Sequence, residues 1–587
     1  MKKILLATVV LFSLASWRPR ETGEWKDKVD ASLLEKVSSG AQAEFLILLH
    51  AQADVSGSRQ LRLKEEKGRF VFEKLKEVAQ QTQGPVIAAL EEAKASYRPF
   101  YIVNAILAKG GLELIQQVAQ LEAVAQVQDN PTVHLQEPMA DGNENPVSFR
   151  NAFVEWGIEK INADDVWDLG YTGQGVVIGG QDTGYDWGHP AIRDTYRGWN
   201  GNEADHNYNW HDAIHELIGD PENTNGCGLD LTEPCDDHSH GTHTMGTMAG
   251  SESDEGKRIG VAPGARWIAC RNMEEGDGTP ATYIECFEWF LAPYGLNGEN
   301  ADVQYAPHVI NNSWSCPESE GCNPSNFATM EMVVNNLKAA GIVVVVSAGN
   351  SGNSCETVST PAAMYENSFS VGATQQNDTI AGFSSRGPVT VDGSGRLKPN
   401  VSAPGVGVRS AVLNGGFASF SGTSMAGPHV AGLVALLISA KPELAGQVEE
   451  IETIIEQTAQ PLLSSQDCGD FSGQQIPNAV YGYGRVDALA AVLEVLEVSG
   501  ANSQAPTPQL KVFPNPTSGQ AFFRMEGLEG SAQVEAFTLS GQLVYSKQWN
   551  AGNGSIMQVD LSALPSGIYW YRVVTQDQQF EGKLVRQ

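Results

Sequence analysis

The feature that most constrains the fold is a run of five β-branched residues, Ile-Val-Val-Val-Val, at residues 342–346. Because this run does not alternate between apolar and polar residues, both faces of the strand that it forms should be buried. Strands of this kind occur in parallel sheets that carry helices on both faces. A similar run occurs at residues 176–180, with further strand patterns at residues 265–269, 309–313 and 369–373. Helical patterns alternate with these strands, which predicts an α/β domain over residues 150–498.

A second feature is the segment Ser-Gly-Thr-Ser-Met-Ala-Gly-Pro-His-Val-Ala-Gly at residues 421–432, which opens a long apolar run typical of a buried helix. A helix start offers free backbone N–H groups, so the hydroxyl of Ser424 could act as a nucleophile whose oxyanion they stabilise. We expect Pro428 to fall in the first helical turn, where its missing N–H has no partner to lose. The alternative is that Ser424 only caps a core helix.

A serine nucleophile needs a general base, usually His, and a carboxylate that orients the base. The histidine that follows Ser424, His429, lies in the same predicted helix and cannot reach back to the hydroxyl. The base must therefore come from upstream, where His240 lies in a segment that again opens a helix. The strand predicted from Val176 ends in an acid, Asp182, at the edge where open α/β sheets place active sites. The resulting order, Asp, His, Ser, excludes the α/β-hydrolase order.

Together with Ser-Ala-Gly-Asn at residues 347–350, these segments resemble those of the subtilisin-like serine proteases, the subtilases. The resemblance implies that Asp182 is the acid, His240 the base and Ser424 the nucleophile, and that Asn350 donates to the oxyanion. It also implies a subtilisin-like parallel sheet with helices on both faces. An extended substrate would pair with the edge segment Ser313, Trp314 and Ser315, which together with Ser347, Ala348 and Gly349 would line the pocket for the residue before the scissile bond. Trp314 could equally be an ordinary core residue.

The activity that this resemblance implies is that of a serine endopeptidase, which hydrolyses peptide bonds of proteins through an acyl-enzyme intermediate. Two other classes remain open. One is a subtilase fold retained for binding, and the other is a zinc hydrolase that uses His238, His240 and His243. The chemistry of the triad requires no cofactor. A structural Ca²⁺ ion is compatible with the abundant Asp and Glu, but no Asp-x-Asp-x-Asp-Gly loop occurs, so the metal ligands stay unknown.

The N-terminal part predicts an exported precursor. Residues 1–17 have the pattern of a signal peptide, with an apolar run too short to span a membrane. Residues 40–138 predict a small α+β unit with strands at 43–49 and 100–107. This unit resembles the subtilase propeptide, which assists folding and then acts as an intramolecular inhibitor; an unrelated accessory domain is the alternative. The maturation cut is expected between Val133 and Asn151.

The C-terminal part predicts a separate domain. Residues 499–509 have the composition of a linker, and residues 510–587 contain alternating strands typical of a small all-β sandwich. The Pro-Asn-Pro opening and the Leu-Ser-Gly-Gln turn resemble the C-terminal sorting domain of type IX secretion cargo in Bacteroidetes-type bacteria. The resemblance implies passage through the outer membrane, with the secretion machinery as a partner and a secreted or cell-surface enzyme as the result. A substrate-binding β module is the alternative.

Charge and cysteine content agree with an exported protein. The formal net charge of −32 argues against nucleic acid and anionic membranes as partners. The eight cysteines suggest disulfides, of which Cys227–Cys235 and Cys316–Cys322 would close short loops. For the other four we take Cys270–Cys286 and Cys355–Cys468, although the spacing leaves other connectivities open. The long segment between Asp182 and His240 is expected to be a surface insertion.

Overall fold

The computed structural model describes residues 25–136, 139–140, 154–219, 225–252 and 257–498, and then 509–513, 515–517, 519–526, 530–539, 541–551, 556–575 and 579–586. The predicted signal peptide, nearly all of the predicted linker and most of the segment predicted to hold the maturation cut lie outside these residues. The chain divides into two compact units. Of the described residues, 25–51, 81–99 and 105–129 form the first, and 52–80, 100–104 and those from 130 onward form the second.

The first unit is a small α+β fold, as predicted. Strand β1 (Ala43–Leu49) pairs antiparallel with β3 (Ala105–Gly110) and β4 (Val124–Asp129), and β2 (Tyr97–Phe100) lies beyond β3. Alternate residues of β1, namely Phe45, Ile47 and Leu49, pack into one core with side chains of the helices. The helices that contribute to this core are α1 (Ala31–Ser38), α3 (Gly84–Glu92) and α4 (Leu112–Ala119), and the short helix η1 (Lys26–Lys28) lies between the core residues Trp25 and Val29.

The strand predicted at residues 100–107 is wrong in its first half. Residues 101–104 form a turn, and β3 begins only at Ala105. The backbone N–H groups of Tyr101 and Ile102 bond the carboxylate of Glu288 instead of a neighbouring strand. An apolar run by itself does not reveal such a partner, because the partner lies far away in the sequence.

The second unit is built on a parallel sheet with the order β17-β16-β15-β14-β7-β11-β8. Every pairing within it is parallel. Its strands are β7 (Val177–Asp182), β8 (Trp210–Asp212), β11 (Arg266–Arg271), β14 (Val309–Asn312), β15 (Val343–Ser347), β16 (Phe369–Thr374) and β17 (Val401–Pro404). The predicted strands are therefore confirmed. The predicted surface insertion is only partly right, because β8 lies within it and extends the sheet, with Trp210 buried.

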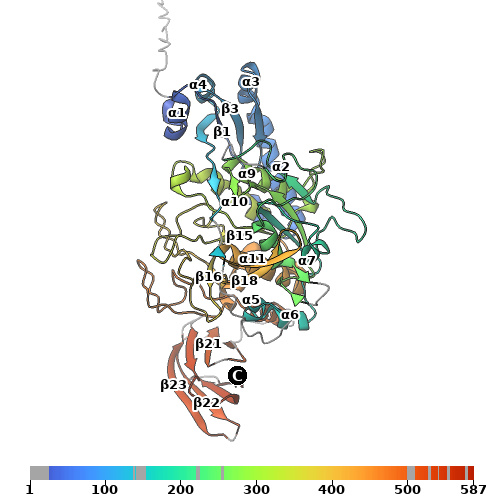
Figure 1. The fold of residues 1–587 in the computed structure, drawn as a ribbon. Helices are drawn as coiled ribbons and strands as arrows, with labels where there is room; N and C mark the ends of the chain where they lie inside the picture. Colours follow the sequence, from blue (N-terminus) through green and yellow to red (C-terminus); the bar gives the residue numbers. More distant parts are fainter. Residues whose placement is uncertain are drawn as a thin grey trace, which may run out of the picture. The chain divides into compact units, whose positions relative to one another are not determined.

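Two groups of helices cover this sheet (Figure 1). Helices α8 (His240–Ala249), α11 (Thr423–Ala440) and α13 (Ala488–Val498) form one group, in which α11 contacts β14 to β17. Helices α9 (Pro280–Leu291) and α10 (Phe327–Ala339) contact each other and form the second group. The remaining helices are η2 (Ser56–Gln60), α2 (Lys64–Thr82), α5 (Trp156–Lys160), α6 (Ala163–Asp168), α7 (Pro190–Arg193), η3 (Val303–Tyr305), η4 (Glu318–Glu320), η5 (Pro442–Leu444) and α12 (Val448–Thr458).

Short antiparallel ladders complete this unit. They join β9 (Ser251–Glu252) with β10 (Lys257–Arg258), β12 (Met273–Glu274) with β13 (Asp277–Gly278) and β5 (Val133–His134), and β18 (Val408–Val412) with β19 (Gly416–Ser421) and β6 (Met139–Ala140). The ladder that contains β5 is important because β5 belongs to the predicted propeptide.

Helix α11 starts earlier than the sequence suggests. It begins at Thr423, so Pro428 lies inside the helix and not in its first turn, which corrects the expectation. Pro428 cannot donate to the carbonyl oxygen of Ser424, four residues before it. The hydroxyl of Ser313 donates to that oxygen instead, at 3.3 Å. Among the described residues, α11 alone is long and apolar enough to span a membrane, and 89% of it is buried, as in a core helix.

The C-terminal domain is a small sandwich of antiparallel strands, as predicted (Figure 1). One sheet has the order β20-β21-β24 and the other β23-β22-β25-β26. Phe523 and Val559 from the first sheet share a core with Val534 and Leu584 from the second. The strands are β20 (Gln509–Phe513), β21 (Gln520–Glu526), β22 (Gly530–Thr538), β23 (Leu543–Ala551), β24 (Ile556–Asp560), β25 (Gly567–Val574) and β26 (Gln579–Arg586).

Candidate active site

Asp182 is the last residue of β7 and is fully buried. Its Oδ1 atom lies 2.6 Å from Nδ1 of His240 and accepts a hydrogen bond of 2.8 Å from the backbone N–H of Thr183. The hydroxyl of Thr244 donates to Oδ2 at 3.4 Å. A buried carboxylate needs such donors to stay charged, and they hold it against the imidazole. The structure therefore brings Asp182 and His240 together.

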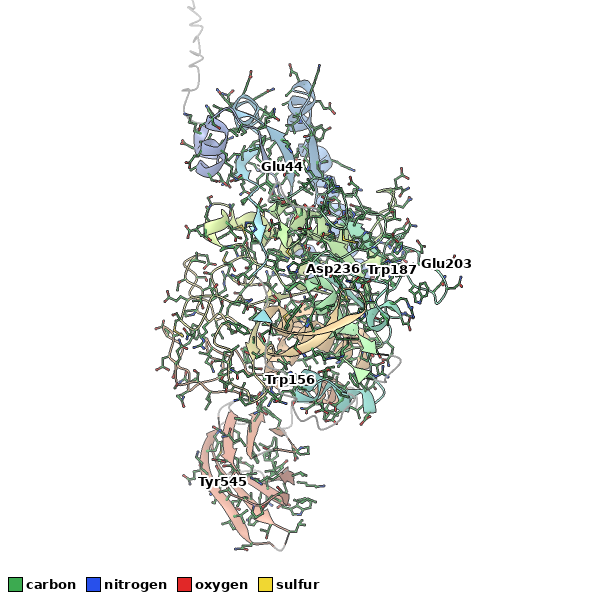
Figure 2. The ribbon with its side chains drawn as sticks, viewed as in Figure 1. Glu44, Trp156, Trp187, Glu203, Asp236 and Tyr545 are labelled. Carbon is green, nitrogen blue, oxygen red and sulfur yellow. A yellow bond between two sulfur atoms is a disulfide. The ribbon has the colours of Figure 1, made fainter. Side chains whose placement is uncertain are left out.

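A second carboxylate, Asp236, which is labelled in Figure 2, bonds the loop that leads into α8. Its Oδ1 accepts from the N–H groups of His238 and Ser239 at 2.9 and 3.0 Å and from the hydroxyl of Thr183 at 2.9 Å. Its Oδ2 accepts from the N–H and the hydroxyl of Thr242 at 3.0 and 2.6 Å. Because Thr242 lies in the first turn of α8, Asp236 satisfies a free N–H of that helix. The cap sets the position of His240, the first residue of α8.

The backbone around His240 is unusually constrained. Ser239 has φ +85°, a left-handed conformation that is rare for residues other than glycine. A Cβ atom on Gly241 would lie 2.1 Å from the carbonyl oxygen of Gly184 and 3.0 Å from Cβ of Asp182. Glycine at this position therefore lets α8 start directly against the end of β7, which is what the short contact between Asp182 and His240 requires.

Ser424 is the second residue of α11 and is buried. Its hydroxyl donates to the carbonyl oxygen of Ser313 at 3.4 Å. Helices α8 and α11, which begin at His240 and Thr423, pack against each other. His429 turns away from Ser424, since its Nδ1 bonds the carbonyl oxygen of Met425 at 2.8 Å, as expected for a residue that cannot serve as the base.

Asn350 stands beside the start of α11. Its side-chain oxygen accepts hydrogen bonds of 2.9 Å from both the backbone N–H and the hydroxyl of Thr423. A Cβ atom on Gly422 would lie 3.6 Å from Nδ2 of Asn350. The amide nitrogen therefore does not bond Thr423. It lies beside Gly422, two residues before Ser424 in the sequence, where it can donate to a developing oxyanion.

The residues predicted to line the substrate site have different surroundings, and of these Ser313 bonds Ser424. Ser313 and Ser347 face inward, with their hydroxyl oxygens 3.3 Å apart. Gly349 has φ +102° and its N–H donates to the hydroxyl of Thr423 at 3.2 Å. Trp314 is buried and stacks on Tyr283, with ring centroids 4.0 Å apart. Ala348 is buried, and Ser315 is half-buried.

Strand β13, which pairs with the extended segment β5 in this structure, is not among the elements predicted for the site. Strand β5 pairs antiparallel with it, with His134 opposite Asp277 and Val133 opposite Gly278. The N–H of Leu135 donates to the carbonyl oxygen of Gly276 at 2.7 Å. The next residue, Gln136, accepts from the backbone N–H of Asn350 through its side-chain oxygen at 3.3 Å. The two glycines that flank Asp277 were the available signal, because glycine in a strand often marks the close approach of another backbone.

The three histidines of the zinc alternative do not converge. Nδ1 of His240 faces Asp182, whereas Nε2 of His243 lies 3.0 Å from the carbonyl oxygen of Val408. Burial, followed by the neighbouring His240, lowers the pKa of His243 to about 3. Within the described ranges, no group of three or more His, Cys, Asp or Glu side chains is arranged to hold a metal ion. The calcium ion stays a prediction without assigned ligands.

The cysteines pair as predicted: Cys227–Cys235, Cys270–Cys286, Cys316–Cys322 and Cys355–Cys468. The first of these disulfides lies in the segment before His240.

A buried ion-pair network also involves this segment. Arg271, the last residue of β11, is fully buried. Arg271 bonds Asp237 at 2.6 Å and lies 3.8 Å from Asp212. Burial raises the pKa of both carboxyl groups above the ordinary value, and the guanidinium of Arg271 offsets part of this rise. This network fixes the segment beside the site.

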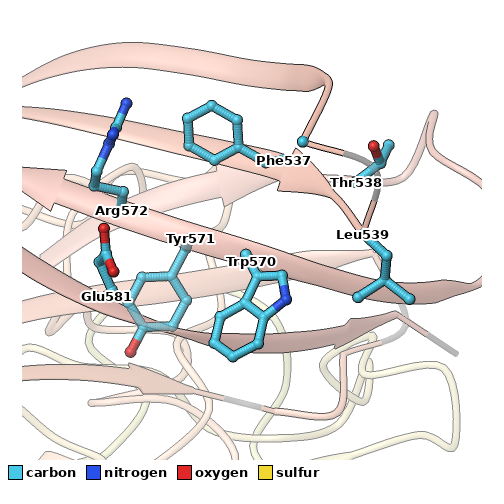
Figure 3. A pocket seen from close by; sticks show the side chains of 8 residues that line it. Phe537, Thr538, Leu539, Trp570, Tyr571, Arg572 and Glu581 are labelled. Carbon is cyan, nitrogen blue, oxygen red and sulfur yellow. The ribbon is translucent and has the colours of Figure 1, made fainter.

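A pocket in the C-terminal domain contains none of the candidate catalytic residues (Figure 3). It is lined by Phe537, Leu539, Trp570 and Arg572, among others. Leu539 is 66% exposed and Trp570 is 49% exposed. The chemistry suggested by Asp182, His240 and Ser424 is therefore separate from this hollow.

Comparisons with known proteins agree with this geometry. Residues 173–484 match the Subtilase family, and residues 511–587 match the Secretion system C-terminal sorting domain. Bacillopeptidase F of Bacillus subtilis is 34% identical over 509 residues, which cover 81% of this chain and 33% of that protein. Subtilisin BL of Lederbergia lenta is 32% identical over 339 residues, which cover 58% of this chain and 98% of that protein. The chain thus spans a third of the first relative and nearly all of the second.

A parallel sheet with a buried Asp–His pair at its carboxyl edge is the α/β arrangement in which active sites lie at that edge. Because the family match covers more than half of its length, the chain belongs to the subtilase family of serine endopeptidases. Its C-terminal residues belong to the sorting domains, which indicates type IX export to the cell surface or out of the cell.

Proposed function

We propose that this protein is a secreted serine endopeptidase that is made as a self-processing zymogen and that uses Asp182, His240 and Ser424 as its catalytic triad. The observation that carries the proposal is the buried hydrogen bond of 2.6 Å between Asp182 and His240, next to the helix that begins at Thr423. An imidazole held in this way presents its Nε2 atom as a general base.

In the proposed reaction, Ser424 Oγ attacks the carbonyl carbon of the peptide bond while His240 takes its proton. Asn350 Nδ2 and the N–H of Ser424 donate to the oxyanion of the tetrahedral intermediate. His240 then gives the proton to the leaving amine, which produces the acyl-enzyme. Water, deprotonated by His240, hydrolyses this ester and restores Ser424. Asp182 keeps the imidazole in the correct tautomer and stabilises its positive charge.

The arrangement of residues 130–136 supports a zymogen. Asn130 accepts a hydrogen bond of 3.0 Å from the N–H of Ala281, in the first turn of α9. The chain then runs along β13 as β5 and brings Gln136 to Asn350. We infer that this segment occupies the substrate site, that Gln136 precedes the scissile bond, and that cleavage there leaves the propeptide bound as an inhibitor.

Additional contacts would hold the cleaved propeptide in place. Glu288 accepts from the N–H groups of Tyr101 and Ile102 at 2.5 and 2.8 Å. Lys67 of α2 is buried, and its ammonium donates to the carbonyl oxygen of Gly446 at 2.6 Å. Lys64 donates to the carbonyl oxygen of Ala306 at 2.9 Å, and burial lowers its pKa to about 7. These contacts do not involve the catalytic residues. They would therefore still hold the propeptide after its bond at the catalytic centre has been cut.

The test is a comparison of the purified full chain with its Ser424→Ala variant, by intact mass and by sequencing of the new N-terminus. The proposal predicts that the wild-type chain is cut after Gln136 and that the variant stays intact. Cleavage of both proteins at the same bond, under conditions without another protease, would reject self-processing by Ser424.

We further infer that the outer-membrane secretion machinery recognises the C-terminal domain. The match of residues 511–587 to the sorting domains supports this role. In the native host, deletion of residues 510–587 should leave the peptidase inside the outer membrane, with its activity intact after cell lysis. Unchanged release into the medium would reject this role.

A further inference from the structure

The disulfide-closed loop between Cys316 and Cys322 lies beside the peptide strand β5. Gly321 of this loop has φ +100°, and a Cβ atom at that position would lie 3.0 Å from the ring of Pro131. The loop therefore approaches the chain just before β5. It carries η4, with Glu318 exposed and Glu320 half-buried.

His134 of β5 lies between two carboxylates. Its Nδ1 atom is 2.5 Å from Oδ1 of Asp277, the residue opposite it in the ladder. Its backbone N–H donates to Oε2 of Glu320 at 3.2 Å. Burial raises the pKa of Glu320 above the ordinary value, and the contacts with His134 offset part of this rise. Asp277 comes from β13 and Glu320 from the loop, so the two acids reach the same residue from different elements.

Neighbouring residues of β5 have different surroundings, as the alternation of a strand requires. Val133 is 1% exposed, whereas the side chain of His134 is 58% exposed. The third position before the inferred scissile bond is therefore not an apolar pocket. It is an open position flanked by negative charge, and this chain fills it with the one residue among 133–136 that can become a cation.

We propose that Asp277 and Glu320 form an acidic subsite that selects substrates with a cationic side chain, Arg, Lys or protonated His, at the third residue before the scissile bond. This inference rests on the proposed function, in which Gln136 is the residue before that bond. The N–H contact to Glu320 is available to any residue, so it holds the backbone. Selectivity comes from the side-chain pairing with Asp277 and from the combined negative charge of both acids.

The expected preference is moderate because the subsite is partly open to water. Exposed ion pairs contribute little and are screened by salt, whereas partly buried ones contribute more. The side chain of Asp277 is 19% exposed. We therefore expect a three- to tenfold higher kcat/KM for Arg than for Gln at this position, on the order of a single partly exposed ion pair.

The test uses the matured enzyme and acyl-Val-Xaa-Leu-Gln-aminomethylcoumarin peptides, in which Xaa is Arg, Gln or Glu. The order of kcat/KM should be Arg, then Gln, then Glu. The Arg-to-Gln ratio should fall toward one in D277N/E320Q and in 0.5 M salt. Glu318→Gln is the matched control, because it removes one negative charge from the same loop at an exposed position and should keep the ratio.

Each result decides a different claim. A ratio near one in the wild-type enzyme, or a ratio that neither high salt nor D277N/E320Q reduces, would reject the acidic subsite while the peptidase function stands. If the variant fails to mature, the salt dependence of the wild-type ratio decides alone. Absence of cleavage of every peptide, in protein that has lost its propeptide, would reject the proposed function itself.

Discussion

The side-chain oxygen of Asn350 accepts two hydrogen bonds from Thr423, one from its backbone N–H and one from its hydroxyl, both at 2.9 Å. A backbone N–H can only donate, so the atom that faces it must be the amide oxygen. This contact decides the orientation of the amide group. Its nitrogen therefore faces away from Thr423, and a Cβ atom on Gly422 would lie 3.6 Å from it.

The first prediction concerns this amide. Asn350→Ala should lower kcat by about a hundred- to a thousandfold with little change in KM, the loss known for the corresponding donor in subtilisin, a member of the same family. Thr423→Val, which removes one of the two donors that orient Asn350, should lower kcat by a smaller factor. Steady-state kinetics on one peptide substrate measures both. An increase in KM at constant kcat would show that Asn350 binds substrate and does not stabilise the transition state.

The second prediction concerns Arg271, which is fully buried beside the carboxylates of Asp237 and Asp212. Arg271→Met leaves two buried acids without their cation and should lower the free energy of unfolding by about 3–5 kcal/mol. Denaturant unfolding of the Ser424→Ala protein, which does not digest itself, measures this. Arg193→Met is the control, since Arg193 pairs with Asp194 at the surface and should change stability by less than about 1 kcal/mol. Equal effects of the two substitutions would contradict the role of the buried network.

The third prediction is a loss of stability in acid. Burial lowers the pKa of His429 to about 4, compared with 6.5 for an ordinary histidine. The unfolded chain therefore binds a proton before the folded chain does. The contribution of His429 is fully present above pH 6.5 and is lost at about 1.4 kcal/mol per pH unit as the pH falls toward 4.

Denaturant unfolding of the Ser424→Ala protein between pH 8 and pH 4 tests this prediction. A second substitution, His429→Gln, should flatten the decline between pH 6.5 and 4, because glutamine does not titrate. The comparison uses the slope with pH, so the cost of the substitution at neutral pH does not affect it. Identical slopes for both proteins would show that His429 does not control acid stability.

The fourth prediction concerns release of the propeptide. Lys67→Met removes the buried ammonium that bonds the carbonyl oxygen of Gly446. We expect peptidase activity to appear about tenfold sooner after self-cleavage, as loss of one buried charged hydrogen bond would produce. Lys74→Met is the matched control, because Lys74 lies on the same helix but pairs with Glu77 at the surface. The lag between the cleaved band on a gel and the onset of activity is the measurement, and equal lags would contradict a binding role for Lys67.

Much of the catalytic domain could be predicted from local patterns. The run at residues 342–346 is apolar at every position, so only a strand buried on both faces suits it, and β15 is such a strand. The candidate catalytic residues could be found because each lies at or next to the end of a strand or in the first turn of a helix. The pairing of Asp182 with His240 then follows from the end of β7 meeting the start of α8.

The remaining features depend on contacts between distant parts of the chain. The pairing of β5 with β13 joins residues more than 140 positions apart, and no local pattern specifies that register. Pro428 inside α11 is tolerated because Ser313, from another segment, bonds the carbonyl oxygen that Pro428 leaves free. Likewise, Tyr101 and Ile102 leave the predicted strand because Glu288 accepts from both of their N–H groups.

The central claim is that Ser424 is a nucleophile activated by His240. The most direct measurement is labelling of the matured protein with a fluorophosphonate, followed by mass analysis of the labelled peptide. The account predicts one label, on Ser424, and no label at this position in Ser424→Ala, which keeps its propeptide. Matured protein that does not react, or a label on another residue with Ser424 unmodified, would contradict it.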